Sequence, residues 1–325
     1  MWSITGDPQV PDRGPMTLPG SWPFQPKRTP VFYGWVIWLV STLGFLMSVP
    51  GQTMGMAVFT DPFIAAFGLS RTQLSVAYFI GTVTSALFLT RAGRLYDRVG
   101  ARTMVVGASV LLALMLAFIS SIHLLATGAG SLLGISLGVM AFPLITMGYF
   151  GVRFAGQGVL TSASRNVLMP WFERRRGLVT GVRGVFVSLG FSLAPLPLAM
   201  LISAYGWRGA LWILLAALVL FAFIALLLLR DDPQSCGLAP DGDDAPVDPD
   251  AQRVSDARGP AATLQEARRS PVFWVYSLGM SVWALFGTAV TYHIVSIFAE
   301  AGRDADAAFG YFFPNSVVAV TVNLS

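Results

Sequence analysis

The ionisable side chain placed deepest in an apolar stretch of this sequence is that of Arg153, in the run GVRFAGQG over residues 151–158. It stands eighteen residues before Trp171, so on one continuous helix it lies ~27 Å from that end. A guanidinium at membrane depth costs about 3 kcal/mol on insertion scales and attracts carboxylates. Arg153 is therefore a candidate for anion binding or coupling, with Gln157 as a neighbouring polar candidate. The alternative is an arginine that extends to the outer interface or braces the first helix.

A few other polar side chains interrupt the apolar stretches. His293 titrates near neutral pH and is a candidate proton carrier; the alternative is a residue hydrogen-bonded to a neighbouring helix. Gln52 and Asn166 are predicted either to line a cavity or to hold helices together. Arg165 and Arg183 lie about two turns from a basic loop, so we expect both to extend to the cytoplasm.

Metal, disulfide and nucleotide chemistry find no support in the sequence. Cys236 is the single cysteine, there are two histidines, and no HExxH or CxxC spacing occurs. The sequence contains no Gly-x4-Gly-Lys-Ser/Thr run, which would be the signature of an ATP-driven pump. We predict no cofactor, no metal, no catalytic residues and no enzyme. The net charge of +4 does not point to nucleic acid, because the basic residues lie mostly between apolar runs.

Composition predicts a membrane protein. The chain is 54% hydrophobic and 12% charged, against roughly 25% charged in soluble domains. Spanning helices need about 20 apolar residues each, and the sequence offers several such runs. The expected fold class is an all-α polytopic protein whose solvent is the lipid bilayer.

The expected spans cover residues 31–46, 72–89, 102–122, 133–167, 178–202, 210–229 and 271–298, with an eighth starting near Ala307. Pro50-Gly51 is predicted to break the first helix, and Ser70 is predicted to cap the second after a turn at Gly68. Residues 123–147 are apolar and Gly-rich. We expect an outer loop at 124–131 there, and the alternative is a re-entrant or interfacial segment.

The polar segments set the predicted domains and orientation. Residues 1–30 are expected to be a disordered tail, 31–230 an N-terminal six-helix bundle, 231–268 an acidic, Pro-rich linker, and 269–325 an incomplete second bundle. Arginines gather in the tail, in two loops and in the linker, so these segments and the N-terminus are predicted to be cytoplasmic. The expected location is the cell (inner) membrane.

A basic hairpin of sequence GRLYDRVGAR, residues 93–102, joins the second and third spans. Its pattern Gly-x3-Asp-Arg-x-Gly-x-Arg resembles the loop motif between helices 2 and 3 of the major facilitator superfamily. The matching positions are Gly93, Asp97, Arg98, Gly100 and Arg102. In that family, the carboxylate at the position of Asp97 secures the hairpin within a conformational switch.

A second basic loop strengthens the resemblance and narrows it to the oxalate/formate-antiporter-like and monocarboxylate-transporter-like branch. It is similar to the signature Trp-Phe-x-x-Arg-Arg-Gly through Trp171, Phe172, Arg175, Arg176 and Gly177. Tyr33-Gly34-Trp35, Gly206-Trp207-Arg208 and the linker start also fit this branch. The run around Arg153 resembles an Arg-x-x-Gln-Gly motif of helix 4, with one extra residue before Gln157.

The resemblance implies two six-helix bundles that rock about a central site. The sequence stops within the eighth of twelve helices, so we expect a fragment rather than a natural truncation. The expected function is secondary transport of a small organic anion such as a monocarboxylate, coupled to protons or to exchange. The alternatives are a non-transporting sensor, a defective truncated product, or a carrier of a neutral or cationic solute.

Overall fold

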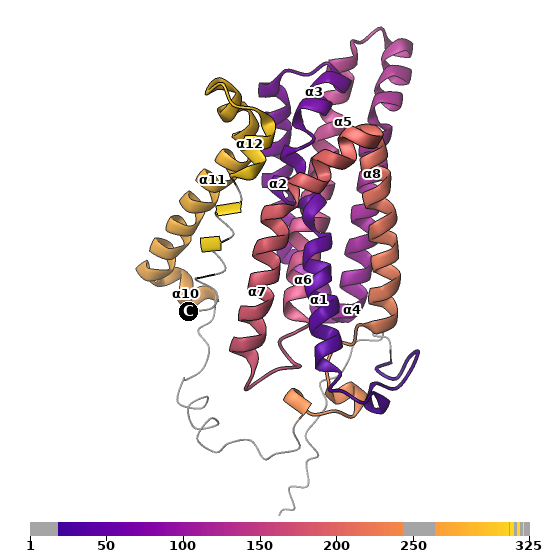
Figure 1. Ribbon diagram of the computed structural model, residues 1–325, viewed down its shortest axis with the longest axis vertical. Coiled ribbons are helices and arrows are strands. Elements are labelled where there is room, and N and C mark those ends of the chain that lie inside the picture. Colours follow the sequence, from indigo (N-terminus) through magenta and orange to yellow (C-terminus); the bar gives the residue numbers. More distant parts are fainter. Residues whose placement is uncertain (1–18, 243–263, 312, 315–316, 319–320, 322–325) are drawn as a thin grey trace, which may run out of the picture.

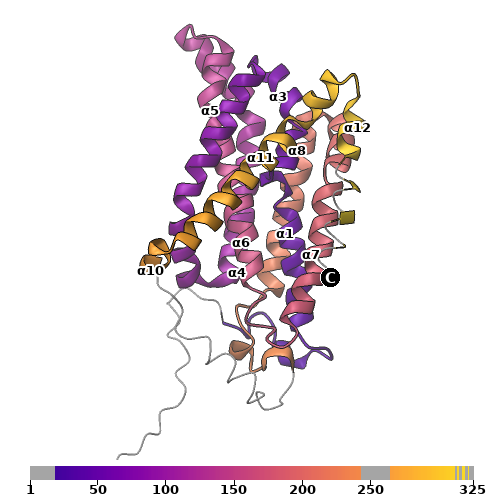
Figure 2. The same ribbon diagram turned by 90° about the vertical axis from the view of Figure 1, so that its left-hand side faces the viewer.

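The computed structural model describes residues 19–242 and 264–311, together with 313–314, 317–318 and 321. All regular structure in these residues is helical, and Figures 1 and 2 show an elongated bundle with α11 (Pro271–Glu300) leaning along one side. Five runs are long and apolar enough to cross a membrane: Gly34–Ala57, Arg71–Leu133, Leu137–Asn166, Arg176–Leu228 and Pro271–Glu300. Two of them turn back on themselves, so the described chain makes seven passes. The predicted all-α polytopic fold is confirmed.

The first pass is broken where the sequence predicted. α1 (Gly34–Met47) gives way to the 3₁₀ turn η2 (Val49–Gly51), followed by α2 (Thr53–Ala57) and α3 (Thr60–Phe67). Pro50 lacks the N–H that would continue the helix. The break therefore frees backbone carbonyls inside the bundle, and they need partners from other helices.

The second and third passes form the long element α4 (Arg71–Leu133). The Ser70 Oγ accepts from the Gln73 N–H at 3.1 Å, and the Gln73 Oε1 accepts from the Ser70 N–H at 2.8 Å. This capping box fixes the start of the helix, as predicted. The chain reverses at Gly100, whose φ of 81° favours glycine. The short basic hairpin is thus confirmed.

The predicted outer loop at 124–131 is wrong, and a re-entrant segment is not observed there, because these residues continue the helix. α4 continues as helix to Leu133, and the turn comes at Gly134, whose φ is 66°. Ala126 and Gly130 are buried, so tertiary packing stabilises this last part of the helix. The fourth pass then consists of α5 (Leu137–Val152), the π-helix η3 (Arg153–Leu160) and α6 (Thr161–Asn166).

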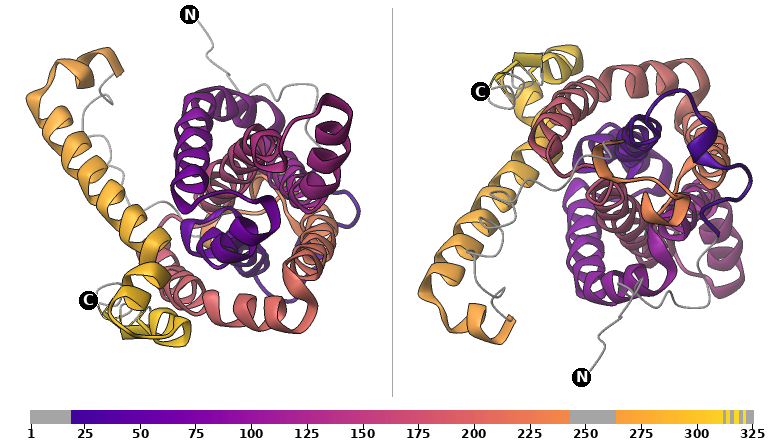
Figure 3. Two further views of the ribbon diagram at one scale, coloured as in Figure 1. Left: turned by 90° about the horizontal axis from the view of Figure 1, so that it is seen from above. Right: turned by 90° about the horizontal axis from the view of Figure 1, so that it is seen from below.

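The remaining passes are α7 (Arg176–Leu193), α8 (Pro195–Leu228) and α11, followed by α12 (Ala305–Gly310). α8 bends at Gly206, four residues after the predicted end of the fifth span. Figure 3 shows that α11 approaches the bundle mainly with its C-terminal half, while its start, next to α10 (Leu264–Arg269), stands away. Its buried residues are Tyr292 and Ile294.

The segment before the first helix packs against the end of the sixth pass. The fully buried Arg230 guanidinium donates from Nε to the Gly20 carbonyl at 2.8 Å. Its Cζ atom lies 5.0 Å from the centroid of the Phe24 ring. η1 (Pro26–Arg28) follows, with Pro26 buried. The predicted disordered tail is therefore wrong for residues 19–30, because Arg230 supplies donors that their carbonyls accept. Residues 1–18 lie outside the described part.

The start of the linker also packs on the bundle, in the turns η4 (Gln234–Cys236) and η5 (Pro240–Gly242). The buried Asp241 carboxylate accepts from three consecutive backbone N–H groups, those of Glu173 at 2.9 Å, Arg174 at 2.8 Å and Arg175 at 3.3 Å. These groups precede α7, where a negative charge is favourable. Residues 231–242 are thus a packed part of the fold, and residues 243–263 lie outside the described range.

We expect Asp241→Ala to lower the free energy of unfolding by about 2 kcal/mol, because it removes the buried carboxylate that accepts three hydrogen bonds from part-buried N–H groups. Asp241→Asn should cost less, because asparagine keeps one acceptor and tolerates the left-handed backbone at this position, where φ is 58°. Thermal unfolding of the protein in detergent measures both changes. The exposed Glu173→Gln variant is the control. Equal stability of all three variants would show that the carboxylate does not hold the loop.

Candidate functional site

The candidate site lies where the break in the first pass meets the π-helix of the fourth. The two backbones touch: a methyl group on Gly51 would lie 2.7 Å from the Gly156 Cα, and one on Gly156 would lie 2.8 Å from the Gly51 Cα. Only glycine at both positions allows this approach. The π-helix also explains the extra residue in the sequence motif, because a π turn accommodates one inserted residue within a helix.

Arg153 begins the π-helix and is 4% exposed. Its Nη1 donates to the Gly51 carbonyl at 3.1 Å and to the Thr53 Oγ1 at 3.4 Å. Its Nε is buried without a hydrogen-bond partner, and no described carboxylate forms an ion pair with the guanidinium. Arg153 therefore braces the broken helix through Nη1, and its Nε–H has no acceptor among the described residues. Extension to the outer interface is excluded by its burial.

Tyr78 lies against this guanidinium and joins Tyr149 and Tyr292 in a tyrosine cluster that the sequence reasoning missed. The Arg153 Cζ lies 5.2 Å from the Tyr78 ring centroid, and the Tyr78 hydroxyl shares a 3.0 Å hydrogen bond with Thr53. Tyr292, from α11, stacks on Tyr78 at 4.4 Å, and its hydroxyl lies 3.5 Å from that of Tyr149. The sequence feature that could have revealed them is the position of these tyrosines inside apolar spans, because a buried phenol hydroxyl needs a hydrogen-bond partner.

Gln52 links the first and fourth passes. Its Nε2 donates to the Ser48 Oγ at 3.0 Å and to the Thr161 Oγ1 at 3.2 Å. Gln52 thus lies close to the site, and its side-chain amide hydrogen-bonds the first pass to the fourth. Gln157 is exposed, and its backbone nitrogen lies beside Gly51, where a Cβ would be 2.9 Å from it.

Asn166 lies near the other end of the fourth pass, beside the hairpin motif. It is exposed and lines a pocket of about 190 Å³ together with Asp97. The same pocket is lined by residues of the second, third and fourth passes, among them Gly93, Met104 and Ser162. The structure therefore brings Asn166 to the conformational motif and not to Arg153.

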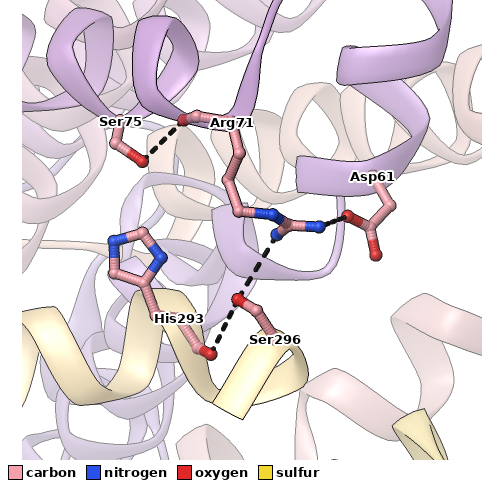
Figure 4. Close-up of polar contacts among 5 residues, drawn as sticks. All are labelled: Asp61, Arg71, Ser75, His293 and Ser296. Carbon is pink, nitrogen blue, oxygen red and sulfur yellow. Dashed lines mark hydrogen bonds and ion pairs between the residues drawn. The ribbon is translucent and has the colours of Figure 1, made fainter. Parts of the chain in front are cut away.

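His293 lies on the turn of α11 that faces Arg71 (Figure 4). Arg71 forms an ion pair with Asp61 at 2.5 Å and donates to the Ser296 Oγ at 3.5 Å. The His293 ring is half-buried and meets the Tyr292 ring edge-on at 5.2 Å. It makes no hydrogen bond to any described residue, so the expected bond to a neighbouring helix is not observed.

The hairpin motif divides into exposed and buried members. Asp97 and Arg98 are exposed, whereas Arg102 is fully buried and donates from Nε to the Leu226 carbonyl at 2.9 Å. The Arg102 N–H donates to the Asp231 carboxylate at 2.8 Å. Arg102 thus fastens the hairpin to the end of the sixth pass. Gly93 is exposed, with open space around its Cα.

The second basic loop is anchored by its aromatic residues. Trp171 and Phe172 are fully buried and pack on Phe32 at 6.2 and 5.6 Å. The Arg176 Nε donates to the Phe172 carbonyl at 3.0 Å. Arg175 and Gly177 are exposed. In this layer at the helix ends, burial lowers the pKa of the Arg230 guanidinium and raises the pKa of the Tyr33 hydroxyl.

The expectation that Arg183 extends to the cytoplasm is wrong. Its side chain is 7% exposed, under Phe45 of α1, whereas Arg165 on α6 is exposed. Helices α1 and α7 pack closely enough here to enclose the Arg183 side chain.

These features define a multi-pass helical membrane protein in which a buried guanidinium, without an ion pair to any described residue, lies beside a broken helix. The chain belongs to the Major Facilitator Superfamily, whose sequence profile matches residues 40–324. It is therefore a secondary transporter, which agrees with the function class predicted from the hairpin motif. The family also points to a transporter rather than an enzyme.

Proposed function

We propose that this protein transports a small organic anion, such as a monocarboxylate, by alternating access, coupled to protons or to exchange of a second anion. The observation that carries the proposal is Arg153, which is buried and has, among the described residues, neither a carboxylate partner nor an acceptor for its Nε–H. A carboxylate accepts from two guanidinium N–H groups at once. A bound anion would thus supply both the missing charge and the missing acceptor.

The distribution of acidic residues supports an anionic substrate. The acidic residues between positions 31 and 230 are Asp61, Asp97 and Glu173, and all three lie near the ends of passes. The middle of these passes contains no acidic residue. A carrier of cations needs a negative charge along its path, since an unpaired cation is costly at membrane depth. The charge of Arg153 therefore favours carboxylates over cationic and neutral solutes. The resemblance to the monocarboxylate-transporter-like branch supports the same substrate class.

The proposed site would lie between two bundles. We propose that residues 31–230 form the first and that 269–325 begin the second, with Tyr292 of α11 stacked on Tyr78, the ring that lies against Arg153. His293 is a candidate proton carrier because its ring makes no hydrogen bond to the described residues. Asp97 is proposed to control the balance between conformations rather than to bind substrate.

Counterflow in proteoliposomes tests this function with the complete protein. Vesicles loaded with unlabelled acetate, lactate or oxalate should accumulate the labelled anion, while vesicles loaded with choline or glucose should not accumulate labelled choline or glucose. A proton gradient that drives lactate uptake indicates symport, and its failure to do so indicates exchange. No anion counterflow above empty vesicles would contradict transport and favour a sensor. Choline or glucose counterflow would overturn the proposed substrate class.

We also propose that the N-terminus, both basic loops and the linker are cytoplasmic, in the cell (inner) membrane. Cys236 is the only cysteine and is half-buried in the linker. An impermeant maleimide should therefore leave intact cells unlabelled and should label Cys236 after permeabilisation. The permeabilised sample is the control for reactivity. Labelling in intact cells would reverse the proposed orientation.

A further inference from the structure

Two arginines converge on one aromatic side chain in the part of the bundle nearer the basic loops. The Cζ atom of Arg165, on α6, lies 5.9 Å from the Phe45 ring centroid, and that of Arg183, on α7, lies 5.8 Å from it. The two guanidiniums are close enough for their charges to repel. A ring provides only part of the compensation that a desolvated guanidinium needs.

No acidic side chain balances this pair in the described part of the chain. Neither Arg165 nor Arg183 forms an ion pair there. Arg183 has one hydrogen bond, a long one of 3.5 Å from Nη1 to the Ser164 carbonyl. The Ser164 hydroxyl is fully buried without a partner. Two cations thus gather where the described part of the chain supplies no anion.

Arg165 lies twelve residues beyond Arg153 along the fourth pass, whereas Arg183 lies on α7. At 1.5 Å per residue, the Arg153 and Arg165 positions are ~18 Å apart. Between them, Gln52, Ser48 and Thr161 form a chain of hydrogen bonds across the first and fourth passes, at 3.0 and 3.2 Å from the Gln52 amide. Hydrogen-bonded polar side chains thus lie between the Arg153 and Arg165 positions.

We propose that Arg165 and Arg183 form a second anion site, which binds the carboxylate of a small organic acid on the loop side of the membrane. Arg165 is exposed and receives the anion, while Arg183 holds it from within the bundle. Two guanidiniums present several N–H donors to the carboxylate oxygens. The Ser164 hydroxyl is available as a further donor. The site does not depend on Arg153 and stands even if Arg153 has a structural role only.

A soluble carboxylate and an anionic lipid headgroup both present oxyanions that two arginines can bind. The experiment therefore has to distinguish the carboxylate from the lipid. The complete protein is purified in detergent and titrated with sodium oxalate against sodium chloride of equal ionic strength, and thermal unfolding is followed. A separate titration with phosphatidylglycerol in the micelles tests the lipid. The Arg153→Gln background isolates the second site from the first.

In the Arg153→Gln protein, oxalate should still raise the unfolding temperature. Addition of Arg183→Gln or Arg165→Gln should weaken this response at least tenfold in apparent Kd, as expected for loss of a charged hydrogen-bond donor. Arg94→Gln, at an exposed arginine of the hairpin, should leave it unchanged. Arg165 is exposed, so its variant is informative even if Arg183→Gln fails to fold.

Three results would overturn the proposal. They are loss of the oxalate response in Arg153→Gln alone, an unchanged response in the Arg165→Gln double variant, and a response to phosphatidylglycerol but not to oxalate. Loss of anion counterflow in the wild-type protein with an intact oxalate response would contradict the proposed function and leave the second site standing.

Discussion

Replacement of Arg153 by glutamine should abolish uptake of organic anions by the complete transporter. Glutamine removes the charge and the bidentate fork while keeping a polar side chain for the Gly51 carbonyl and the Thr53 hydroxyl, which Arg153 now reaches at 3.1 and 3.4 Å. Loss of a charged donor to a bound carboxylate corresponds to about 2–3 kcal/mol, or roughly 30- to 150-fold in affinity. The expected result is uptake near the level of empty vesicles at low substrate concentration.

Arg153→Lys separates charge from geometry. Lysine keeps the positive charge but presents a single ammonium instead of a planar fork, so it should retain a fraction of the uptake with a raised KM. Arg208→Gln is the matched control, because Arg208 is exposed and stacks on Trp207 at 4.5 Å. Initial rates over a range of labelled lactate concentrations give KM and the maximal rate. Normal uptake by Arg153→Gln at low and saturating lactate would reduce Arg153 to a structural brace.

The sequence predicted best those features that depend on neighbouring residues. Pro50 and Gly51 break a helix wherever they stand, and Ser70 with Gln73 carries its capping box within four residues. The depth of Arg153 followed from counting residues to a polar loop. These properties are local, so they could be predicted without a partner helix.

Contacts between distant segments could not be predicted in the same way. Nothing near Tyr78 in the sequence indicates that Tyr292 stacks on it, and nothing near Asp241 indicates that three N–H groups of another loop converge on it. Residues 124–131 look like a loop because glycines interrupt them, yet packing keeps them helical. In each case tertiary packing outweighs the local composition.

The same distinction between local and distant contacts explains why Arg183 is buried. Distance along the helix predicted that Arg183 would reach the cytoplasm, since a long side chain two turns from a loop can do so. Phe45 and the α6 backbone enclose it instead. The burial of a charged side chain in a bundle thus depends on which helix packs over it. Such contacts join distant segments of the chain, so the neighbouring sequence does not reveal them.

Gly156→Ala should destabilise the protein, although glycine to alanine inside a helix ordinarily stabilises by about 1 kcal/mol. The new methyl group would lie 2.8 Å from the Gly51 Cα and 3.1 Å from the Gly51 nitrogen. Both neighbours are backbone atoms, so the first and fourth passes must separate. Overpacking of this kind costs about 1–3 kcal/mol or more, and separation would also draw the Gly51 carbonyl away from Arg153.

Gly107→Ala is the matched control, because Gly107 lies within α4 and a Cβ there would meet no atom within 4 Å. It should unfold at the same temperature as the wild type or slightly higher, while Gly156→Ala should unfold lower and bind oxalate more weakly. Thermal unfolding in detergent, with and without oxalate, measures both effects. The opposite signs of two identical substitutions would show that backbone contact at this seam, rather than helix propensity, positions Arg153. A Gly156→Ala protein as stable as Gly107→Ala would show that the two passes can separate there without cost.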